Sequence, residues 1–217
     1  MWEVVDLIPT KDEWNKALCE RHGEKLQMKF SSATVAICGL GGLGSNIAIS
    51  LARAGIGKLI LIDFDRVDIT NLHRQQYKVS QIGMSKTDAL RDNLLEISPY
   101  VTLETHTIRV TEENAAHLLY GADIICEAFD NAECKAMLTN LVLEKVPDKY
   151  LVAASGMAGF GSANTIKTRK ITRKFYLCGD EESDVQTEGS LVASRVMLCA
   201  AHQAHTVLRI LAEQFET

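Results

Sequence analysis

Four glycines within six positions are the first residues of this sequence whose spacing points to chemistry. They are Gly39, Gly41, Gly42 and Gly44. They follow the apolar run Thr34–Cys38 and open a helical pattern that runs to about Ala54, and a second apolar run ends at Asp63. Glycine has no Cβ, so the backbone there can turn sharply and bring its N–H groups close to a phosphate. This order of strand, glycine turn, helix, strand and acid predicts a nucleotide site, with a ribose hydroxyl on Asp63.

A long polar connection, residues 63–85, follows the second predicted strand, and a loop of that length is uncommon unless it has a function. Its polar candidates are Asp65, Asn71, Arg74 and Gln75. The guanidinium of Arg74 suits phosphate oxygens, and Lys86, at the start of the next helix, offers a point charge. Asp130 and Asn131 follow a later predicted strand, where a carboxylate suits Mg²⁺ shared with phosphate. Plainer roles also fit: Asp130 as a helix N-cap, and Arg74 and Lys86 as solvated charges.

Together, these residues resemble the signature of the ubiquitin-activating-like adenylyltransferases, the family that includes ThiF, MoeB and HesA. The matching residues are Gly39–Ser45, Asp63-Phe64-Asp65, Asn71-Leu72, Arg74-Gln75, Lys86 and Asp130-Asn131. The likeness runs from about Val35 to Gly161 and is closest to the compact ThiF-type proteins of bacterial thiamine synthesis. It implies an ATP-dependent adenylyltransferase that activates the C-terminal Gly-Gly carboxylate of a ubiquitin-fold sulfur carrier and releases pyrophosphate.

The resemblance also assigns roles to single residues. It implies that ATP is bound by the glycine turn with Asp63, Asp65, Asn71, Arg74, Gln75, Lys86 and Asn131, and that Asp130 holds Mg²⁺. In the family, an arginine of one subunit of a homodimer reaches the triphosphate of the other, and Arg21 lies at a suitable distance before the first strand, as do Lys16 and Lys25.

The cysteines carry two further expectations. Many relatives hold a structural zinc with two CxxC pairs, and this sequence has neither pair, so we expect no structural zinc. Cys178 falls in a polar loop where relatives place a reactive thiol, and an ordinary loop cysteine is the alternative interpretation. The acids that follow it, Asp180 to Glu182, are expected to raise its pKa and disfavour the thiolate.

Composition narrows the class of protein. The 217-residue chain is 47% apolar and 24% charged, as is typical of a soluble globular protein, and its net charge of −5 offers no broad basic surface for a nucleic acid. No apolar run reaches the about 18 residues of a membrane-spanning helix, and the N-terminus does not read as a signal peptide. The absence of CxxC spacing among the six cysteines fits reduced thiols, so we expect a cytoplasmic protein with no membrane partner.

Apolar runs and helical patterns alternate along the chain and predict a Rossmann-like α/β domain, with a mostly parallel sheet and helices on both faces. Further strands are predicted at 101–107, 124–127, 150–154 and 162–168, and helices at 86–97, 111–119, 132–145 and 190–213. Residues 1–30 are expected to form a helical extension and residues 31–168 the nucleotide-binding domain. Residues 169–217 are expected to form a mobile crossing loop, 169–189, and the C-terminal helix of the same domain.

Several other functions remain open at this point. The same adenylation chemistry would serve a molybdopterin carrier or a carboxylate linked to tRNA, although the lack of a basic stripe argues mildly against RNA. An NAD-dependent oxidoreductase would explain the glycines and Asp63, but not Asn71 to Gln75 or Asp130-Asn131. A non-catalytic partner of a heterodimeric activating enzyme typically loses the arginine, lysine or aspartate that this chain keeps.

Overall fold

A single sheet of seven strands organises the computed structural model, which describes residues 8–217. The strands are β1 (Thr34–Cys38), β2 (Lys58–Ile62), β3 (Thr102–His106), β4 (Ile124–Glu127), β5 (Tyr150–Ala154), β6 (Lys167–Lys170) and β7 (Phe175–Gly179). They lie in the order β3-β2-β1-β4-β5-β7-β6, and all neighbours are parallel except the antiparallel pair β6 and β7. The chain builds outward from β1 to β3 and then crosses to β4 on the other side of β1. This reversal leaves a crevice at the carboxyl ends of β1 and β4.

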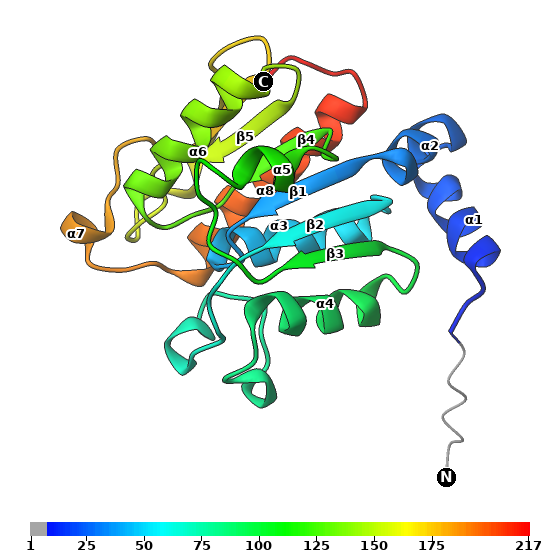
Figure 1. The fold of residues 1–217 in the computed structure, drawn as a ribbon, viewed down its shortest axis with the longest axis horizontal. Coiled ribbons are helices and arrows are strands. Elements are labelled where there is room, and N and C mark those ends of the chain that lie inside the picture. The colour runs from blue at the N-terminus through cyan, green and yellow to red at the C-terminus, as the bar shows by residue number, and fades with distance from the viewer. Residues whose placement is uncertain (1–7) are drawn as a thin grey trace.

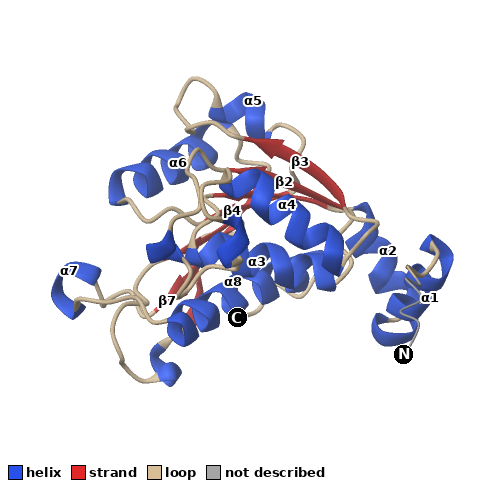
Figure 2. Cartoon of the chain, turned by 90° about the horizontal axis from the view of Figure 1, so that it is seen from below, coloured by secondary structure: helices blue, strands red, loops and turns tan. Residues whose placement is uncertain are grey.

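Helices cover both faces of the sheet (Figures 1 and 2). The helices are α1 (Lys11–His22), α2 (Glu24–Ser32), α3 (Gly42–Arg53), α4 (Lys86–Ile97), α5 (Ala115–Leu119), α6 (Ala132–Lys145), α7 (Val185–Glu188) and α8 (Ala193–Leu211). One face packs against α3, α4 and α8, which bury Leu51, Leu90 and Val207. The other face packs against α5 and α6, which bury Leu119 and Leu138. The predicted Rossmann-like α/β fold with helices on both faces is confirmed.

The N-terminal helices differ in how they attach to this core. Thr10 caps α1 in a capping box with Glu13, and Gly23 separates α1 from α2. No residue of α1 is buried, whereas α2 places Phe30 in the main core. The first seven residues of the predicted extension lie outside the described residues, and its boundary at residue 30 stays a prediction.

The predicted crossing loop is shorter than expected. Strand β7 lies inside the segment 169–189 that was predicted to be a loop, and it pairs with β5 on one side and β6 on the other. The run Phe175–Gly179 buries Tyr176 and Cys178 in the core, which explains why it forms a strand within a charged segment. The predicted strand 162–168 is also displaced, because a 3₁₀ turn at Ala163–Thr165 comes before β6.

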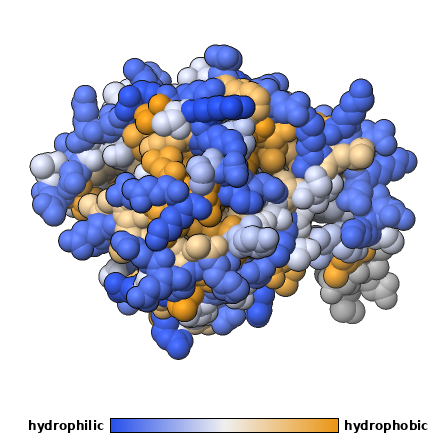
Figure 3. Space-filling view, turned by 45° about the horizontal axis from the view of Figure 1, so that its top comes forward, coloured by the Kyte–Doolittle hydropathy of each residue, from blue (hydrophilic) through white to orange (hydrophobic). Residues whose placement is uncertain are grey.

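Within the described part of the chain, no helix is both long and apolar enough to span a bilayer. On the face drawn in Figure 3, apolar surface gathers in the middle and hydrophilic side chains surround it. Among the large apolar side chains of the described residues, Phe160 is the most exposed, at 84%.

Candidate active site

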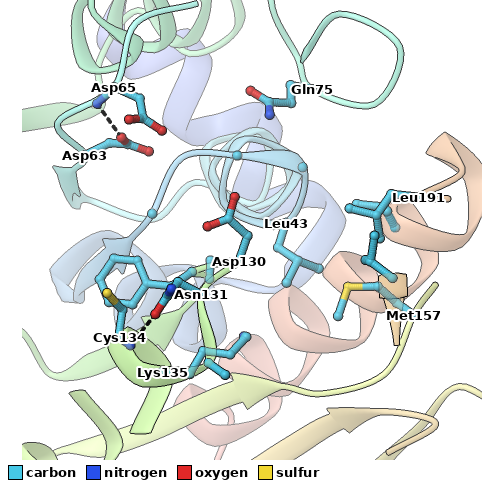
Figure 4. Close-up of a pocket in the computed structure, with 18 of the residues that line it drawn as sticks. Leu43, Asp63, Asp65, Gln75, Asp130, Asn131, Cys134, Lys135, Met157 and Leu191 are labelled. Carbon is cyan, nitrogen blue, oxygen red and sulfur yellow. Dashed lines mark hydrogen bonds between the residues drawn. The ribbon is translucent and has the colours of Figure 1, made fainter. Parts of the chain in front are cut away.

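A cavity of about 560 Å³ occupies the crevice at the carboxyl ends of the strands. Its walls come from the glycine turn, the ends of β2 and β4, the loop after β5 and the start of α8. Figure 4 shows the side chains that converge on it. Of the predicted site residues, ten line this cavity: Gly39, Gly41, Gly42, Asp63, Asp65, Arg74, Gln75, Lys86, Asp130 and Asn131. The sheet reversal is the usual place for a nucleotide in such folds.

The four glycines divide into two kinds. Gly39 has φ +91°, and a Cβ there would lie 2.7 Å from the carbonyl oxygen of Ala128, so only glycine fits. A Cβ on Gly44 would lie 1.8 Å from the carbonyl oxygen of Gly39. Gly44 does not line the cavity, so it serves packing and not ligand contact. Gly41 and Gly42 do line it, at the N-terminus of α3, where unpaired N–H groups and the helix dipole favour an anion.

Asp63 braces this turn from below. Its Oδ2 accepts a hydrogen bond from the N–H of Leu40 at 2.6 Å, and its Oδ1 accepts one from the N–H of Asp65 at 2.8 Å. Burial raises the pKa of the Asp63 carboxyl, and the charge of Lys86 and these two N–H donors oppose that rise. A carboxylate oxygen has a second lone pair, so Asp63 can also accept a ribose hydroxyl as predicted.

Lys86 is buried at the wall of the cavity and is held there by two acids. Its Nζ lies 2.8 Å from Oδ2 of Asp65 and 3.9 Å from Oδ2 of Asp63. Asp65 is the more open of the two carboxylates, with about half of its side chain exposed. The predicted point charge is therefore in place, and it is neutralised by Asp65 in this structure.

The loop after β2 places Arg74 and Gln75 through the fold of a 3₁₀ turn (Ile69–Asn71). The carbonyl oxygen of Asn71 accepts hydrogen bonds from the N–H groups of Arg74 at 3.2 Å and Gln75 at 3.0 Å, and the Asn71 side chain binds the N–H of Asp68. Asn71 does not line the cavity, and its direct contact with the nucleotide stays a prediction. Gln75 is buried and its Oε1 lacks a hydrogen-bond partner, which leaves an acceptor for a ligand.

The corner between β4 and α6 carries Asp130, for which the sequence left two roles open, metal ligand and helix N-cap. Asn131 is the N-cap of α6, since its Oδ1 accepts a hydrogen bond from the N–H of Cys134 at 2.9 Å. Asp130 is exposed and, in Figure 4, its carboxylate lies within the cavity below the glycine turn. The alternative role of Asp130 as the helix cap is therefore excluded.

A metal ion here would depend on the ligand. Residues 8–217 contain no group of three or more His, Cys, Asp or Glu side chains that could hold a metal unaided. A single exposed carboxylate, Asp130, next to the N-terminus of α3 fits Mg²⁺, which keeps waters and shares its ligands with phosphate oxygens. The residues present thus fit a metal that arrives with a polyphosphate.

A buried ion pair at the floor of the cavity was not predicted from the sequence. Glu127, the last residue of β4, is 1% exposed, and the Nζ of Lys135 lies 2.9 Å from its Oε2. Lys135 lines the cavity. Burial raises the pKa of the Glu127 carboxyl, and Lys135 opposes that rise. A glutamate inside an apolar strand is rare unless paired, and this was the signal that could have drawn attention to it.

Besides Gly44 and Asn71, two more predicted site residues lie outside the cavity. Arg21 is exposed on α1, beyond the amino ends of the strands, so it does not reach the cavity of its own chain (Figure 1). Cys178 lies in β7 and is fully buried, so its predicted place in a polar loop is wrong. Burial, rather than the acids that follow it, raises the pKa of its thiol to about 11. A buried neutral thiol is a poor nucleophile, which favours the structural interpretation of Cys178.

The chain is similar in sequence to proteins of one known family. The profile of the ThiF family matches residues 15–217. The chain belongs to the ThiF family. Adenylyltransferase and sulfurtransferase MOCS3 of Culex quinquefasciatus is 37% identical over 137 residues, which cover 62% of this chain and 31% of that protein. Ubiquitin-like modifier-activating enzyme 5 of Caenorhabditis elegans is 49% identical over 83 residues, which cover 38% of this chain and 20% of that enzyme.

Solved structures support the ThiF-type fold over nearly the whole chain. The tRNA N6-threonylcarbamoyladenosine dehydratase TcdA of E. coli, solved with AMP, superposes with a TM-score of 0.83 and 23% identity, covering 95% of this chain and 98% of that one. The same dehydratase has also been solved with ATP, at 22% identity. By contrast, the chain matches only part of the curated relatives, 31% of the Culex protein and 20% of the Caenorhabditis enzyme. The comparisons therefore show the family and the fold of this chain.

Proposed function

We propose that this ThiF-family protein uses ATP to adenylate a carboxylate and releases pyrophosphate. The observation that carries the proposal is the single cavity in which the glycine turn, Arg74, Lys86 and Asp130 meet. The name of the mosquito relative, an adenylyltransferase, and the AMP and ATP complexes of the E. coli fold neighbour support it. An oxidoreductase would use the glycine turn but would leave these three charged residues without a role.

In this reaction the chain's residues mainly position charge. The N-terminus of α3 and the open backbone at Gly41 take the phosphates, and Arg74 and Lys86 neutralise the departing pyrophosphate. Asp130 would hold Mg²⁺ together with the phosphates, and the ion would supply positive charge that offsets the negative charge of the phosphate oxygens. The substrate carboxylate is already ionised at neutral pH, so the protein needs no general base. Alignment of the two anionic reactants supplies most of the acceleration.

The substrate that fits best is the C-terminal carboxylate of a protein. The cavity continues from Asp130 past Met157 and Leu191 to the segment Ser183–Val185, and Figure 4 shows Met157 and Leu191 side by side on that wall. At this end of the cavity the chain carries the exposed acids Glu182, Asp184 and Glu188, and Asp184 lines the cavity. An acidic and apolar rim repels a polyanion and suits a protein with basic and apolar surface.

We therefore assign a ubiquitin-fold sulfur carrier with a Gly-Gly end as the partner, with thiamine thiazole synthesis ahead of the molybdopterin pathway. We further propose a cytoplasmic homodimer in which Arg21 of one subunit approaches the triphosphate of the other. The alternative substrate, a carboxylate linked to tRNA, is favoured by the fold likeness to the E. coli dehydratase and opposed by the acidic rim.

The direct test is ATP–pyrophosphate exchange with purified protein and candidate Gly-Gly carriers. Asp130→Ala and Arg74→Ala should each lower the exchange rate by about 100-fold, because each removes charge stabilisation from the reacting phosphates. Asp92→Ala and Arg91→Ala are matched controls, since both residues are exposed on α4 and lie outside the cavity. Absence of exchange with every carrier would refute the protein substrate, and calorimetric binding of NAD in place of ATP·Mg would refute adenylation.

A further inference from the structure

The buried pair Glu127–Lys135 has no part in the reaction as described. Glu127 ends β4, and Lys135 lies one turn inside α6, with Asp130 between them in the chain. The Nζ of Lys135 lies 3.1 Å from Oε1 and 2.9 Å from Oε2 of Glu127. A buried carboxylate is costly, and its pairing with an ammonium is worth keeping only where geometry matters or the position must be specified.

The hydrogen bonds of the pair tie four elements together. The third donor of the Lys135 ammonium goes to the carbonyl oxygen of Ala154, at the end of β5, at 3.0 Å. Oε1 of Glu127 also accepts from the N–H of Phe129 at 2.8 Å, and its backbone oxygen accepts from Nε2 of Gln203 in α8 at 2.9 Å. The carboxyl ends of β4 and β5, the start of α6 and the middle of α8 are therefore held at fixed distances behind the cavity.

Lys135 itself has no donor left for a ligand. An ammonium has three N–H bonds, and all three point to the Glu127 carboxylate and the Ala154 carbonyl. Although Lys135 lines the cavity, its charge is compensated by Glu127 directly behind it. A direct role in binding phosphate would require the pair to break, which would leave a buried carboxylate alone.

The corner that the pair controls is the one that carries Asp130. The N–H before it, that of Phe129, is bound to Glu127, and the residue after it, Asn131, caps the helix that carries Lys135. The Asp130 carboxylate has no hydrogen bond to any other described residue that would orient it, so its place depends on the backbone of this corner. We propose that Lys135, held by Glu127, is a positioning residue that sets the Asp130 carboxylate for a divalent cation bound with the nucleotide. This inference rests on the proposed function.

The test compares Lys135→Met, which keeps the apolar stem and removes the ammonium, with Lys135→Arg, which restores a cation. Lys145→Met is the matched control, because Lys145 is exposed at the far end of the same helix. Mn²⁺ binding to the complex with a non-hydrolysable ATP analogue is measured by electron paramagnetic resonance. Hydrogen exchange of the Phe129 and Cys134 amides is measured in the free protein.

Lys135→Met should weaken Mn²⁺ binding by about 10-fold or more, in the range seen when groups that orient a metal ligand are removed. It should also speed exchange at Phe129, and Lys135→Arg and Lys145→Met should both stay within about 2-fold of the unaltered protein. Unchanged Mn²⁺ affinity in Lys135→Met, or a defect in Lys135→Arg equal to that of Lys135→Met, would overturn the positioning role. If Lys135→Met does not fold, Glu127→Gln answers the same question, and the same shift in Mn²⁺ affinity is expected from it.

The proposed function and the positioning role of Lys135 can be refuted independently. Faster exchange at Phe129 in the Lys135→Met protein is measured without nucleotide, so it reports on the corner alone. If the unaltered protein showed no ATP–pyrophosphate exchange with any carrier while Lys135→Met still loosened the corner and weakened Mn²⁺ binding, the protein substrate would be wrong and the positioning role would stand.

Discussion

Replacing Gly44 with alanine separates packing from ligand binding within the glycine turn. The added Cβ would lie 1.8 Å from the carbonyl oxygen of Gly39 and 3.1 Å from Cγ2 of Ile37. Ordinary carbon contacts begin near about 3.5 Å, so the turn has to move by more than about 1.5 Å. The obstacle is the backbone carbonyl of Gly39, a residue held in place by the hydrogen bond from its N–H to the carbonyl oxygen of Ile62 at 2.9 Å.

The expected cost follows from two opposing terms. Overpacking costs typically about 1–3 kcal/mol and more where backbone is in the way. Alanine gains back about 1 kcal/mol over glycine inside a helix, and Gly44 lies in α3. We expect Gly44→Ala to lower the free energy of unfolding by about 2 kcal/mol, which for a chain of this size lowers Tm by about 4–8 °C.

Gly41→Ala is the matched variant with the opposite outcome. Gly41 has φ −74°, and a Cβ there would meet only Nε2 of Gln75, at 3.7 Å. We expect its stability to change by less than about 0.5 kcal/mol. Its methyl group would stand where the phosphates approach, so ATP·Mg affinity by calorimetry should fall by about 10-fold or more. Equal stability of the Gly44→Ala protein and the unaltered protein in urea denaturation, or equal destabilisation by both variants, would refute this division of the turn.

Four further outcomes follow from burial. In the native protein at pH 8, Ellman's reagent should react quickly with only Cys19 and Cys134, since the other four thiols are buried, and fast reaction of more than two would contradict the core. Alkylation of Cys178, followed by peptide mass spectrometry, should rise as pH approaches about 11 rather than at the ordinary thiol pKa of 9.0. Between these two pH values the folded chain keeps the Cys178 proton while the unfolded chain loses it, so this thiol makes the free energy of unfolding fall as pH rises. A contribution that rises with pH over this range would contradict the raised pKa. Cys178→Ser should leave ATP–pyrophosphate exchange within about 2-fold of normal, and loss of exchange would restore a catalytic thiol. Arg195→Met should destabilise the protein by about 3 kcal/mol in urea, because it leaves the buried carboxylate of Asp180 unpaired, and the double variant with Asp180→Asn should be less affected.

Local patterns predicted most elements because tertiary structure did not override them. The helices 86–97 and 132–145 and the strand 150–154 have the predicted bounds, with Ser85 and Asn131 as caps. Strand β7 was missed, although its run Phe175–Gly179 is apolar and rich in strand-forming types, because the charged residues on both sides dominate the window. Its partners β5 and β6 come from different parts of the chain, and only the assembled sheet shows that its side chains are buried.

Within the cavity, residue type was easier to predict than role. Motif spacing identified Asp63, Asn71 and Gly44 as ligand-binding, and in the fold each also supports another part of the site: Asp63 the turn, Asn71 the loop and Gly44 the helix. The local sequence does not show that the Asp63 carboxylate binds the N–H of Leu40 and does not face solvent. The two residues are 23 positions apart in the sequence and come together only in the folded chain. The same holds for Glu127, whose partner lies on the next helix and whose burial depends on β5 and α8.

The charges around the cavity explain how a protein of net charge −5 can take a polyphosphate. Lys135 is compensated by Glu127 and Lys86 by Asp65, so within the described residues two cavity cations form no ion pair, Arg74 and Arg109. Arg109 lies over the ring of Phe64, 4.4 Å from its centroid. Asp130 adds a negative charge beside the N-terminus of α3. Two arginines and one helix dipole do not balance a triphosphate of charge near −4 together with an acid. The missing positive charge has to come with the ligand, so we expect the nucleotide to bind as its Mg²⁺ complex, and Asp130 to favour that complex over free ATP.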